Sequence, residues 1–120
     1  MTIPLTTTHG RTVKPLKIKT NNNQKLSCHY FCHIQIAGTN GIPESVAEKT
    51  TFRISTEDKS HPPVDAEIID SVTCALGVIP AAFTWLSHAM DKREFINKVL
   101  KDVPGATIQT EMKIYFYKKM

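Results

Sequence analysis

The sequence predicts an α+β fold in which one antiparallel sheet is covered on one face by two or three consecutive helices. Three observations support this prediction. Residues 25–36 and 49–56 alternate between two kinds of side chain with the two-residue period of a β-strand. Residues 64–101 instead repeat their apolar side chains at helical spacing. A last alternating stretch, residues 106–119, predicts an extra C-terminal strand after the helices.

The size and composition of the chain suit a single domain over residues 1–120, with strands at about 11–56, helices at about 64–101 and a final strand at about 106–119. Its cysteine count of 3 is odd, which argues against a disulfide framework and favours a reducing compartment. We find neither a secretory leader nor an apolar run of about 18 residues that would cross a bilayer. We therefore expect a cytoplasmic protein with no membrane partner.

The N-terminal part of the chain predicts the start of the sheet. Residues 2–8 are rich in threonine and fit a short edge strand or an arm. Residues 11–20 predict a strand, and Pro15 places it at a sheet edge or a bulge because proline cannot donate a hydrogen bond to a neighbouring strand. The asparagines at 21–23 predict a turn.

Residues 25–37 predict the longest strand and residues 49–56 the next one. Residues 38–47 contain glycine and proline and predict a loop, so we expect the two strands to form an antiparallel pair. One face of this pair is apolar and carries Leu26, Cys28, Tyr30, Cys32, Ile34, Ile36, Phe52 and Ile54. The other is mostly polar and basic and carries Lys25, Ser27, His29, Phe31, His33, Gln35, Lys49, Thr51, Arg53 and Ser55.

The distribution of charge favours a polyanionic partner for the second face. The formal net charge is +4, and no acidic residue occurs between Met1 and Thr39. An exposed cationic sheet face is a surface to which nucleic acid can bind. The alternative interpretation is a solvated basic edge without a partner.

The second half of the chain predicts the helices and the last strand. Pro80 ends a first helix or opens a second one, and Asp91 with Glu94 forms a capping box that starts the last helix. Residues 104–105, a proline and a glycine, end it. The first helical stripe consists of Ile68, Ile69, Val72, Leu76 and Ile79. The final strand alternates Met112, Ile114 and Phe116 with Lys113, Tyr115 and Tyr117.

Residues 28–33, with two cysteines and two histidines, are the obvious candidate for a metal site. On a strand, Cys28 and Cys32 lie about 13 Å apart at roughly 3.3 Å per residue, and His29 and His33 are equally distant on the other face. A tetrahedral zinc site needs its ligands about 2.0–2.3 Å from one ion. We therefore expect neither a metal nor another cofactor, and we expect the cysteines to be small buried hydrophobic residues.

No catalytic signature accompanies the basic face, so we expect a protein that is not an enzyme. Cys74 lies in an apolar predicted helix, where packing explains it better than a role as a nucleophile. His29, His33 and Arg53 together imitate the acid–base pair and phosphate clamp of a ribonuclease. A small ribonuclease is therefore one alternative function.

The order of these segments resembles the coat proteins of the small single-stranded RNA bacteriophages. The similar stretch runs from residue 22 to residue 90 and comprises the two predicted strands, their loop and the helices that follow. The resemblance implies an intertwined dimer in which the strands of both subunits form one sheet and the helices of each cross onto the other. The chain departs from the family in its short N-terminal part and in residues 91–120, which add a helix and a strand.

The resemblance also implies a function. The open face of the sheet would line a shell and contact genomic RNA through Lys25, Ser27, His29, His33, Lys49, Thr51 and Arg53. We then expect a self-assembling capsid subunit, located in the virion and assembled in the host cytoplasm. Uncovered sheet edges favour pairing with a second copy, which a symmetric dimer satisfies. The other alternative is a small protein-binding module, such as an inhibitor or immunity protein, that uses the same sheet or the helix face.

Overall fold

The computed structural model describes residues 7–8, 11–37 and 50–120. They form a mixed sheet with the strand order β1-β2-β4-β5-β6-β3. The strands are β1 (Thr7–Thr8), β2 (Arg11–Ile18), β3 (Tyr30–Ile36), β4 (Thr51–Thr56), β5 (Val64–Ala75) and β6 (Glu111–Lys119). The helices are the 3-10 helices η1 (Asn22–Ser27) and η2 (Leu76–Val78) and the α-helices α1 (Ala81–His88) and α2 (Lys92–Asp102). The predicted α+β class and the C-terminal strand are confirmed.

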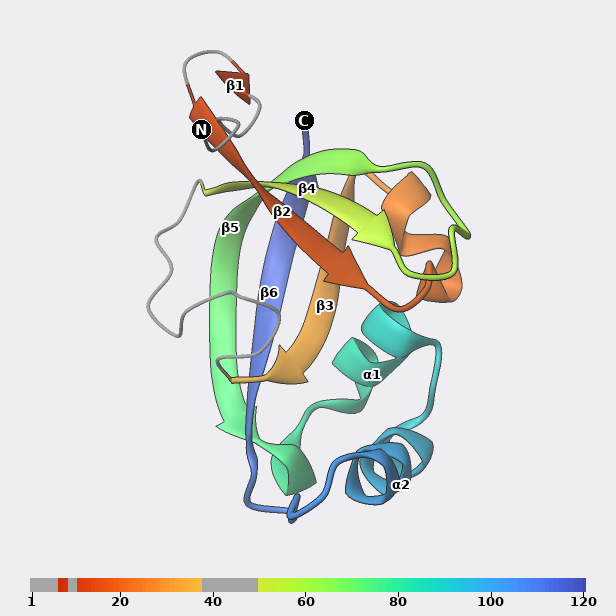
Figure 1. The fold of residues 1–120 in the computed structure, drawn as a ribbon. Coiled ribbons are helices and arrows are strands. Elements are labelled where there is room, and N and C mark those ends of the chain that lie inside the picture. The colour runs from red at the N-terminus through yellow and green to blue at the C-terminus, as the bar shows by residue number, and fades with distance from the viewer. Residues whose placement is uncertain (1–6, 9–10, 38–49) are drawn as a thin grey trace.

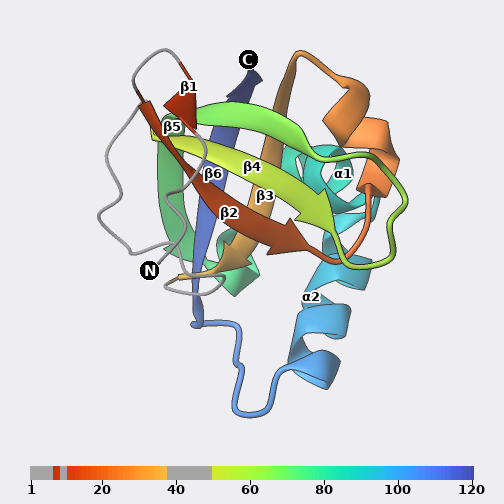
Figure 2. The ribbon, with the colours of Figure 1, turned by 45° about the horizontal axis from the view of Figure 1, so that its top comes forward.

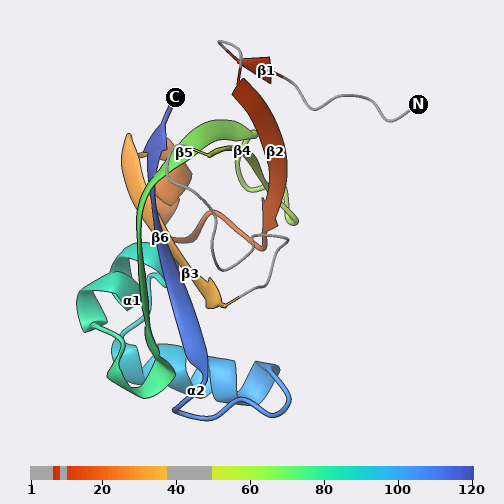
Figure 3. The same ribbon diagram turned by 90° about the vertical axis from the view of Figure 1, so that its left-hand side faces the viewer.

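The sheet curls into two layers, with the α-helices outside the curl. Figure 1 shows β2 and β4 crossing in front of β5, β6 and β3. Figure 3 shows the same layers from the side, with α1 on the side of the β5–β6–β3 layer that faces away from β2. The inside of the curl is filled by Leu16, Ile18, Leu26, Phe31, Phe52, Ile54, Val64, Ala66, Ile68, Tyr115 and Tyr117. A second apolar cluster joins the sheet to the helical segments and consists of Cys32, Ile34, Leu76, Ile79, Phe95, Met112 and Ile114.

Residues 64–75 form a strand, so the helix predicted for the start of the 64–101 region is wrong. Val64, Ala66 and Ile68 alternate with acidic residues and are buried, as strand periodicity requires. A β-bulge between Ile68 and Asp70 then shifts the alternation by one residue. The predicted helical stripe therefore combines Ile68 and Val72, which lie on opposite faces of β5, with Leu76 and Ile79, which lie beyond the strand.

The predicted pairing of β3 with β4 is also wrong. β3 pairs antiparallel with β6, whereas β4 pairs parallel with β2 and antiparallel with β5. The sheet is therefore mixed rather than antiparallel, and β6 lies inside it between β5 and β3. Residues 38–49, which contain the predicted loop, lie outside the described residues.

Three local predictions about residues 11–29 and 91–94 can be compared with the structure. Pro15 lies on β2. On the side of β2 that faces away from β4, only Arg11 and Thr12 pair with another strand within the described residues, so the predicted edge position of Pro15 is confirmed. The capping box is confirmed because Asp91 Oδ1 accepts a hydrogen bond from the Glu94 backbone N–H at 2.8 Å. Residues 25–29 do not belong to β3, since η1 extends to residue 27 and the strand begins at residue 30.

In the described part of the chain, no helix is both long enough and apolar enough to cross a membrane.

Candidate functional site

The predicted basic face is not assembled, because part of it is buried. Lys25, His33 and Thr51 have only 2%, 7% and 1% of their surface exposed. Lys25 belongs to η1, under the end of α1, and His33 lies opposite Tyr115 of β6 in a part of the sheet that is buried on both faces. The prediction that these three residues line an open sheet face was therefore wrong.

Of the remaining predicted residues, those that the structure describes lie on separate elements. Ser27 and His29 are exposed near the end of η1, and Lys49 lies outside the described residues. Arg53 of β4 forms a bidentate ion pair with Asp65 of β5, with Nε–Oδ1 and Nη2–Oδ2 distances of 2.8 and 2.9 Å. The two residues face each other because residues 64–75 form a strand, which brings a carboxylate to the predicted basic face.

A buried cluster of polar side chains lies where the end of α1 meets η1 and β3. Lys25 Nζ lies 2.6 Å from His33 Nδ1 and donates to the Ser87 carbonyl oxygen, also at 2.6 Å. Ser87 Oγ accepts from the Ile34 backbone N–H at 2.8 Å and lies 2.7 Å from His88 Nδ1. The rings of His33 and His88 stack with their centroids 5.2 Å apart. We call Lys25, His33, Ser87 and His88 the polar cluster.

The polar cluster covers the outer edge of the sheet at β3. β3 is the last strand of the sheet, and the Ile34 N–H on its outer edge is bonded by Ser87. Exposed edge amides tend to pair with other chains, so this contact protects the edge. It also explains why α1 buries Thr84 and Ser87 while Trp85 and Leu86 remain 53% and 54% exposed.

Sequence analysis missed Ser87 and His88, although a local signal was present. Thr84, Ser87 and His88 are polar residues at spacings of three and four, so they share one face of a helix. A polar stripe opposite apolar residues would suggest a solvated face on an isolated helix. Here that stripe is buried against β3, a long-range contact that no local pattern reports.

The polar cluster is poorly suited to positive charge. Burial lowers the pKa of Lys25 from 10.5 to about 7 and the pKa of His88 to about 3. Burial, and then the charge of Lys25, lowers the pKa of His33 well below its usual value. No carboxylate within the described residues pairs with Lys25. Lys25 Nζ makes two hydrogen bonds in the polar cluster, a number that a neutral amine can make without leaving a third N–H to be satisfied.

Two contacts of the polar cluster involve histidine nitrogens that can donate or accept. Lys25 Nζ lies 2.6 Å from His33 Nδ1, and Ser87 Oγ lies 2.7 Å from His88 Nδ1. A neutral amine and a hydroxyl can each donate or accept, so both contacts are hydrogen bonds in either tautomer of the neutral rings.

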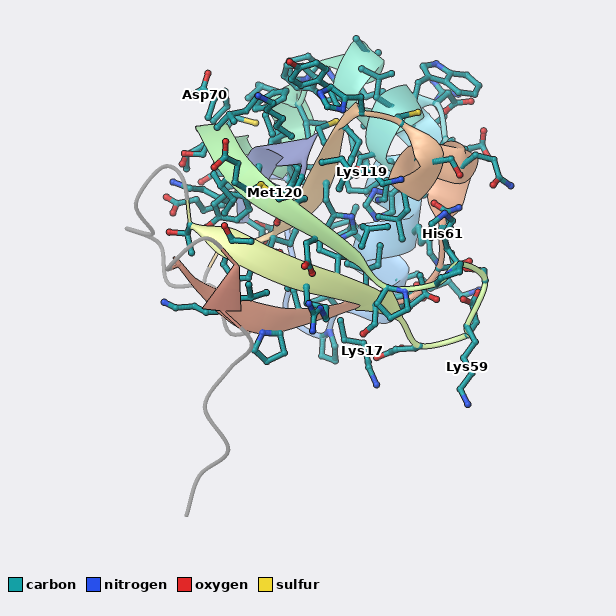
Figure 4. The ribbon with its side chains drawn as sticks, turned by 90° about the horizontal axis from the view of Figure 1, so that it is seen from above. Lys17, Lys59, His61, Asp70, Lys119 and Met120 are labelled. Carbon is teal, nitrogen blue, oxygen red and sulfur yellow. The ribbon has the colours of Figure 1, made fainter. Side chains whose placement is uncertain are left out.

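A groove of about 410 Å³ lies beside the polar cluster, where residues of β2 and β3, the two sides of the curled sheet, meet α2. Its lining consists of Lys17, Ile18, Lys19, Thr20, His33, Ile34, Gln35, Ile36, Glu57, His88, Met90, Phe95, Lys98, Val99, Asp102, Val103 and Met112. We call it the seam groove. Figure 2 shows β2 running toward the side of the molecule on which α2 lies. Figure 4 shows Lys17 projecting outward at the β2 edge.

A second hollow, of about 220 Å³, also reaches Lys25. It is mainly apolar and is lined by Lys25, Cys28, Tyr30, Phe31, Cys32, Ile69, Leu86, Phe116 and Tyr117. We call it the aromatic cavity. The Tyr117 hydroxyl is buried without a hydrogen-bond partner among the described residues, and burial raises its pKa. A buried hydroxyl without a partner is unfavourable unless something else bonds to it.

The cysteines do not form a metal centre. Over the described residues, no group of three or more His, Cys, Asp or Glu side chains is placed to hold a metal ion. All three cysteines are free, and Cys32 is buried as predicted. Cys28 is exposed, so the prediction that it is buried was wrong, because it follows η1 rather than lying on β3.

Comparison with known proteins identifies a related fold but not a function. No protein-family model matches the chain, and no curated protein matches it. The fold is similar to the crystal structure of protein EF3133 from Enterococcus faecalis V583, of the family DUF984, with a TM-score of 0.58. The match covers 82% of this chain and 68% of that chain at 4% sequence identity. At this identity the similarity shows a shared fold alone.

Proposed function

We propose that this protein is a non-enzymatic RNA-binding protein and that it holds single-stranded RNA in the seam groove. The observation that carries this proposal is the composition of the groove. It combines the exposed lysines Lys17, Lys19 and Lys98 with the buried His33 and the half-buried His88, whose pKa values are lowered by burial. In such a lining the lysines can contact phosphates, the histidines can hydrogen-bond to base edges, and the apolar residues can contact base faces.

The lysines of the seam groove suit a phosphate backbone. Lys17 and Lys19 are exposed at the end of β2, and Lys98 is exposed on α2 across the groove. Lys98 is paired with Asp102 at 2.8 Å, and Glu57 also lines the groove, so the excess of positive charge is modest. Phosphate contacts of this kind give salt-sensitive affinity that depends little on sequence.

The inner part of the seam groove suits an unpaired base. The Nε2 atoms of His33 and His88 can each hydrogen-bond to a base edge, as donor or acceptor according to the tautomer, while the half-buried Ile36, Met90 and Val99 can provide apolar contact for a base face. The volume lies within the range of roughly 300–1,000 Å³ typical of small-ligand sites. A groove of this size accepts a splayed nucleotide but not a duplex, which favours single-stranded RNA.

The proposal is tested by fluorescence anisotropy with a fluorescein-labelled oligouridine of about 12 nucleotides, a length that covers a typical single-strand site. We expect Lys17→Glu/Lys19→Glu to weaken binding by about tenfold or more at low salt and to reduce the slope of log K against log salt by roughly 1.4. The control Lys92→Glu/Lys118→Glu makes the same change of net charge at residues that do not line the groove. Equal weakening by both double variants, or no binding by the native protein, would contradict the proposal.

The same RNA samples test the alternative of a ribonuclease. A non-enzymatic protein leaves the oligonucleotide intact during the titration. Reproducible cleavage that is lost in His88→Ala would instead assign an acid–base role to the seam groove.

Homodimerisation and a capsid role remain predictions from the resemblance to coat proteins. Their main argument was the open basic sheet face, of which Lys25, His33 and Thr51 are buried. Size-exclusion chromatography with light scattering distinguishes the possibilities. Particles or obligate dimers that contain RNA would support the capsid role, whereas a monomer that binds short RNA would support the seam groove without a shell.

A further inference from the structure

We propose that Lys25 is a nucleophilic amine that captures small apolar aldehydes or ketones from the aromatic cavity as imines. This inference is independent of RNA binding, since it concerns the aromatic cavity rather than the seam groove. It rests on the hydrogen bonding of Lys25, on the character of the cavity and on the position of His33.

The hydrogen bonds of Lys25 fit a neutral amine. Its Nζ makes two hydrogen bonds, one with His33 Nδ1 and one to the Ser87 carbonyl oxygen. A neutral amine donates two N–H groups and keeps one lone pair, whereas an ammonium has a third proton to satisfy. The titratable groups that influence Lys25 from the packed elements are Cys32 and His33 of β3 and His88 of α1. None of them is a carboxylate, so no ion pair with these groups offsets the cost of burying an ammonium.

The aromatic cavity fits a small, planar, apolar ligand. Its walls include Tyr30, Phe31, Phe116 and Tyr117 in addition to Lys25. Its volume of about 220 Å³ exceeds the roughly 150 Å³ of an apolar cavity that binds benzene.

The reaction is an addition followed by loss of water, with no change of oxidation state. The lone pair of Lys25 Nζ attacks the carbonyl carbon, a C–N bond forms and the carbonyl π bond breaks. One of the two Nζ protons moves to the oxygen through His33 Nδ1, in the tautomer that leaves Nδ1 unprotonated, and gives a neutral carbinolamine. The second Nζ proton then moves to the hydroxyl group by the same route, the C–O bond breaks, and water leaves the imine behind. One amine and one carbonyl compound thus give one imine and one water.

The test is reductive trapping on the native full-length chain. The protein is incubated with benzaldehyde and sodium cyanoborohydride near pH 7.5, and the modified lysines are located by peptide mass spectrometry. An ordinary lysine is almost fully protonated at this pH and reacts slowly. We expect Lys25 to be labelled at least about tenfold faster than the exposed Lys59. Labelling of Lys59 and other exposed lysines while Lys25 stays unmodified would overturn the proposal.

A second measurement tests the route through the aromatic cavity. Leu86 lines the cavity and is 54% exposed, so Leu86→Trp narrows the cavity without removing buried packing. We expect it to slow the labelling of Lys25 by about fivefold or more and to leave Lys59 unaffected. The control is Leu100→Trp, a change at a 38% exposed leucine of α2 that does not line the cavity. Labelling of Lys25 in Leu86→Trp at the native rate would overturn the assignment.

Discussion

The contact between Ser87 and the outer edge of β3 predicts that Ser87→Ala destabilises the protein strongly for so small a change. Ser87 is fully buried, and its Oγ bonds both the Ile34 N–H and His88 Nδ1. The substitution leaves these two groups without their partner, while the Ser87 carbonyl can still accept from Lys25. A buried polar group that loses its partner costs about 1–3 kcal/mol. Because His88 is only partly buried and can find water, we expect a loss of about 2–4 kcal/mol in total.

This loss is large compared with the stability of a chain of this length. A 120-residue domain typically has an unfolding free energy of roughly 6–18 kcal/mol. With a urea dependence of about 1–3 kcal/mol per M, the midpoint of unfolding should fall by roughly 0.7–4 M. The assay is urea unfolding followed by the fluorescence of Trp85, the only tryptophan of the chain, which lies two positions before Ser87 on α1.

The matched control for this prediction is Ser71→Ala, which removes the same hydroxyl from an exposed position on β5. Native-state hydrogen exchange adds a local measurement, because the Ile34 amide should lose protection in Ser87→Ala but not in Ser71→Ala. Midpoints that agree within about 0.3 M for the two variants, with an Ile34 amide still protected, would refute the reasoning.

Three further predictions concern the folded state. The unfolded chain keeps a proton on Lys25 up to about pH 10.5, whereas the folded chain releases it near pH 7. The free energy of unfolding should therefore rise between pH 7.0 and 8.5. We expect this rise to be about 1–2 kcal/mol larger in the native protein than in Lys25→Met. Urea titrations at both pH values measure this difference, and equal pH dependence would show that Lys25 stays charged. Asp91→Ala should lower the free energy of unfolding by about 1 kcal/mol because it removes the N-cap of α2. Circular dichroism and the urea midpoint measure this loss, and an unchanged midpoint would argue against the capping hydrogen bond. Ile114→Ala, at a fully buried position, should cost about 2–5 kcal/mol, whereas Ile108→Ala, at a position 58% exposed, should change little; similar costs would contradict the assigned core.

Local patterns predicted much of the secondary structure of this chain. Asp91 and Glu94 specify the start of α2 through contacts three residues apart, so the sequence contains all the information needed. Alternation also identified the last strand, of which Met112 and Ile114 are buried. The helix predicted at the start of the 64–101 region failed because its apolar stripe joins Ile68 and Val72, which lie on opposite faces of one bulged strand, to Leu76 and Ile79, which lie beyond that strand. The stripe has helical spacing although residues 64–75 form a strand.

The candidate site was harder to predict because it depends on which strands pair. The alternation of side chains correctly places His33 and Ile34 on opposite faces of the strand, but it does not indicate whether either face is exposed to solvent. The pairing of β3 with β6 and the docking of α1 on the β3 edge decide that His33 is buried. Likewise, Arg53 meets Asp65 only because β4 pairs with β5. Such contacts join segments far apart in sequence and leave no periodic signal.

The most direct test of the proposed RNA-binding groove is an amide NMR titration of the native protein with the oligouridine. If RNA occupies the groove, the amides of Lys19, His88 and Lys98 should shift in proportion to bound RNA, while those of Arg53 and Asp65 should stay in place. Shifts centred on Arg53 and Asp65, with Lys19 and Lys98 unchanged, would contradict the account and return RNA binding to the outer face of β4 and β5.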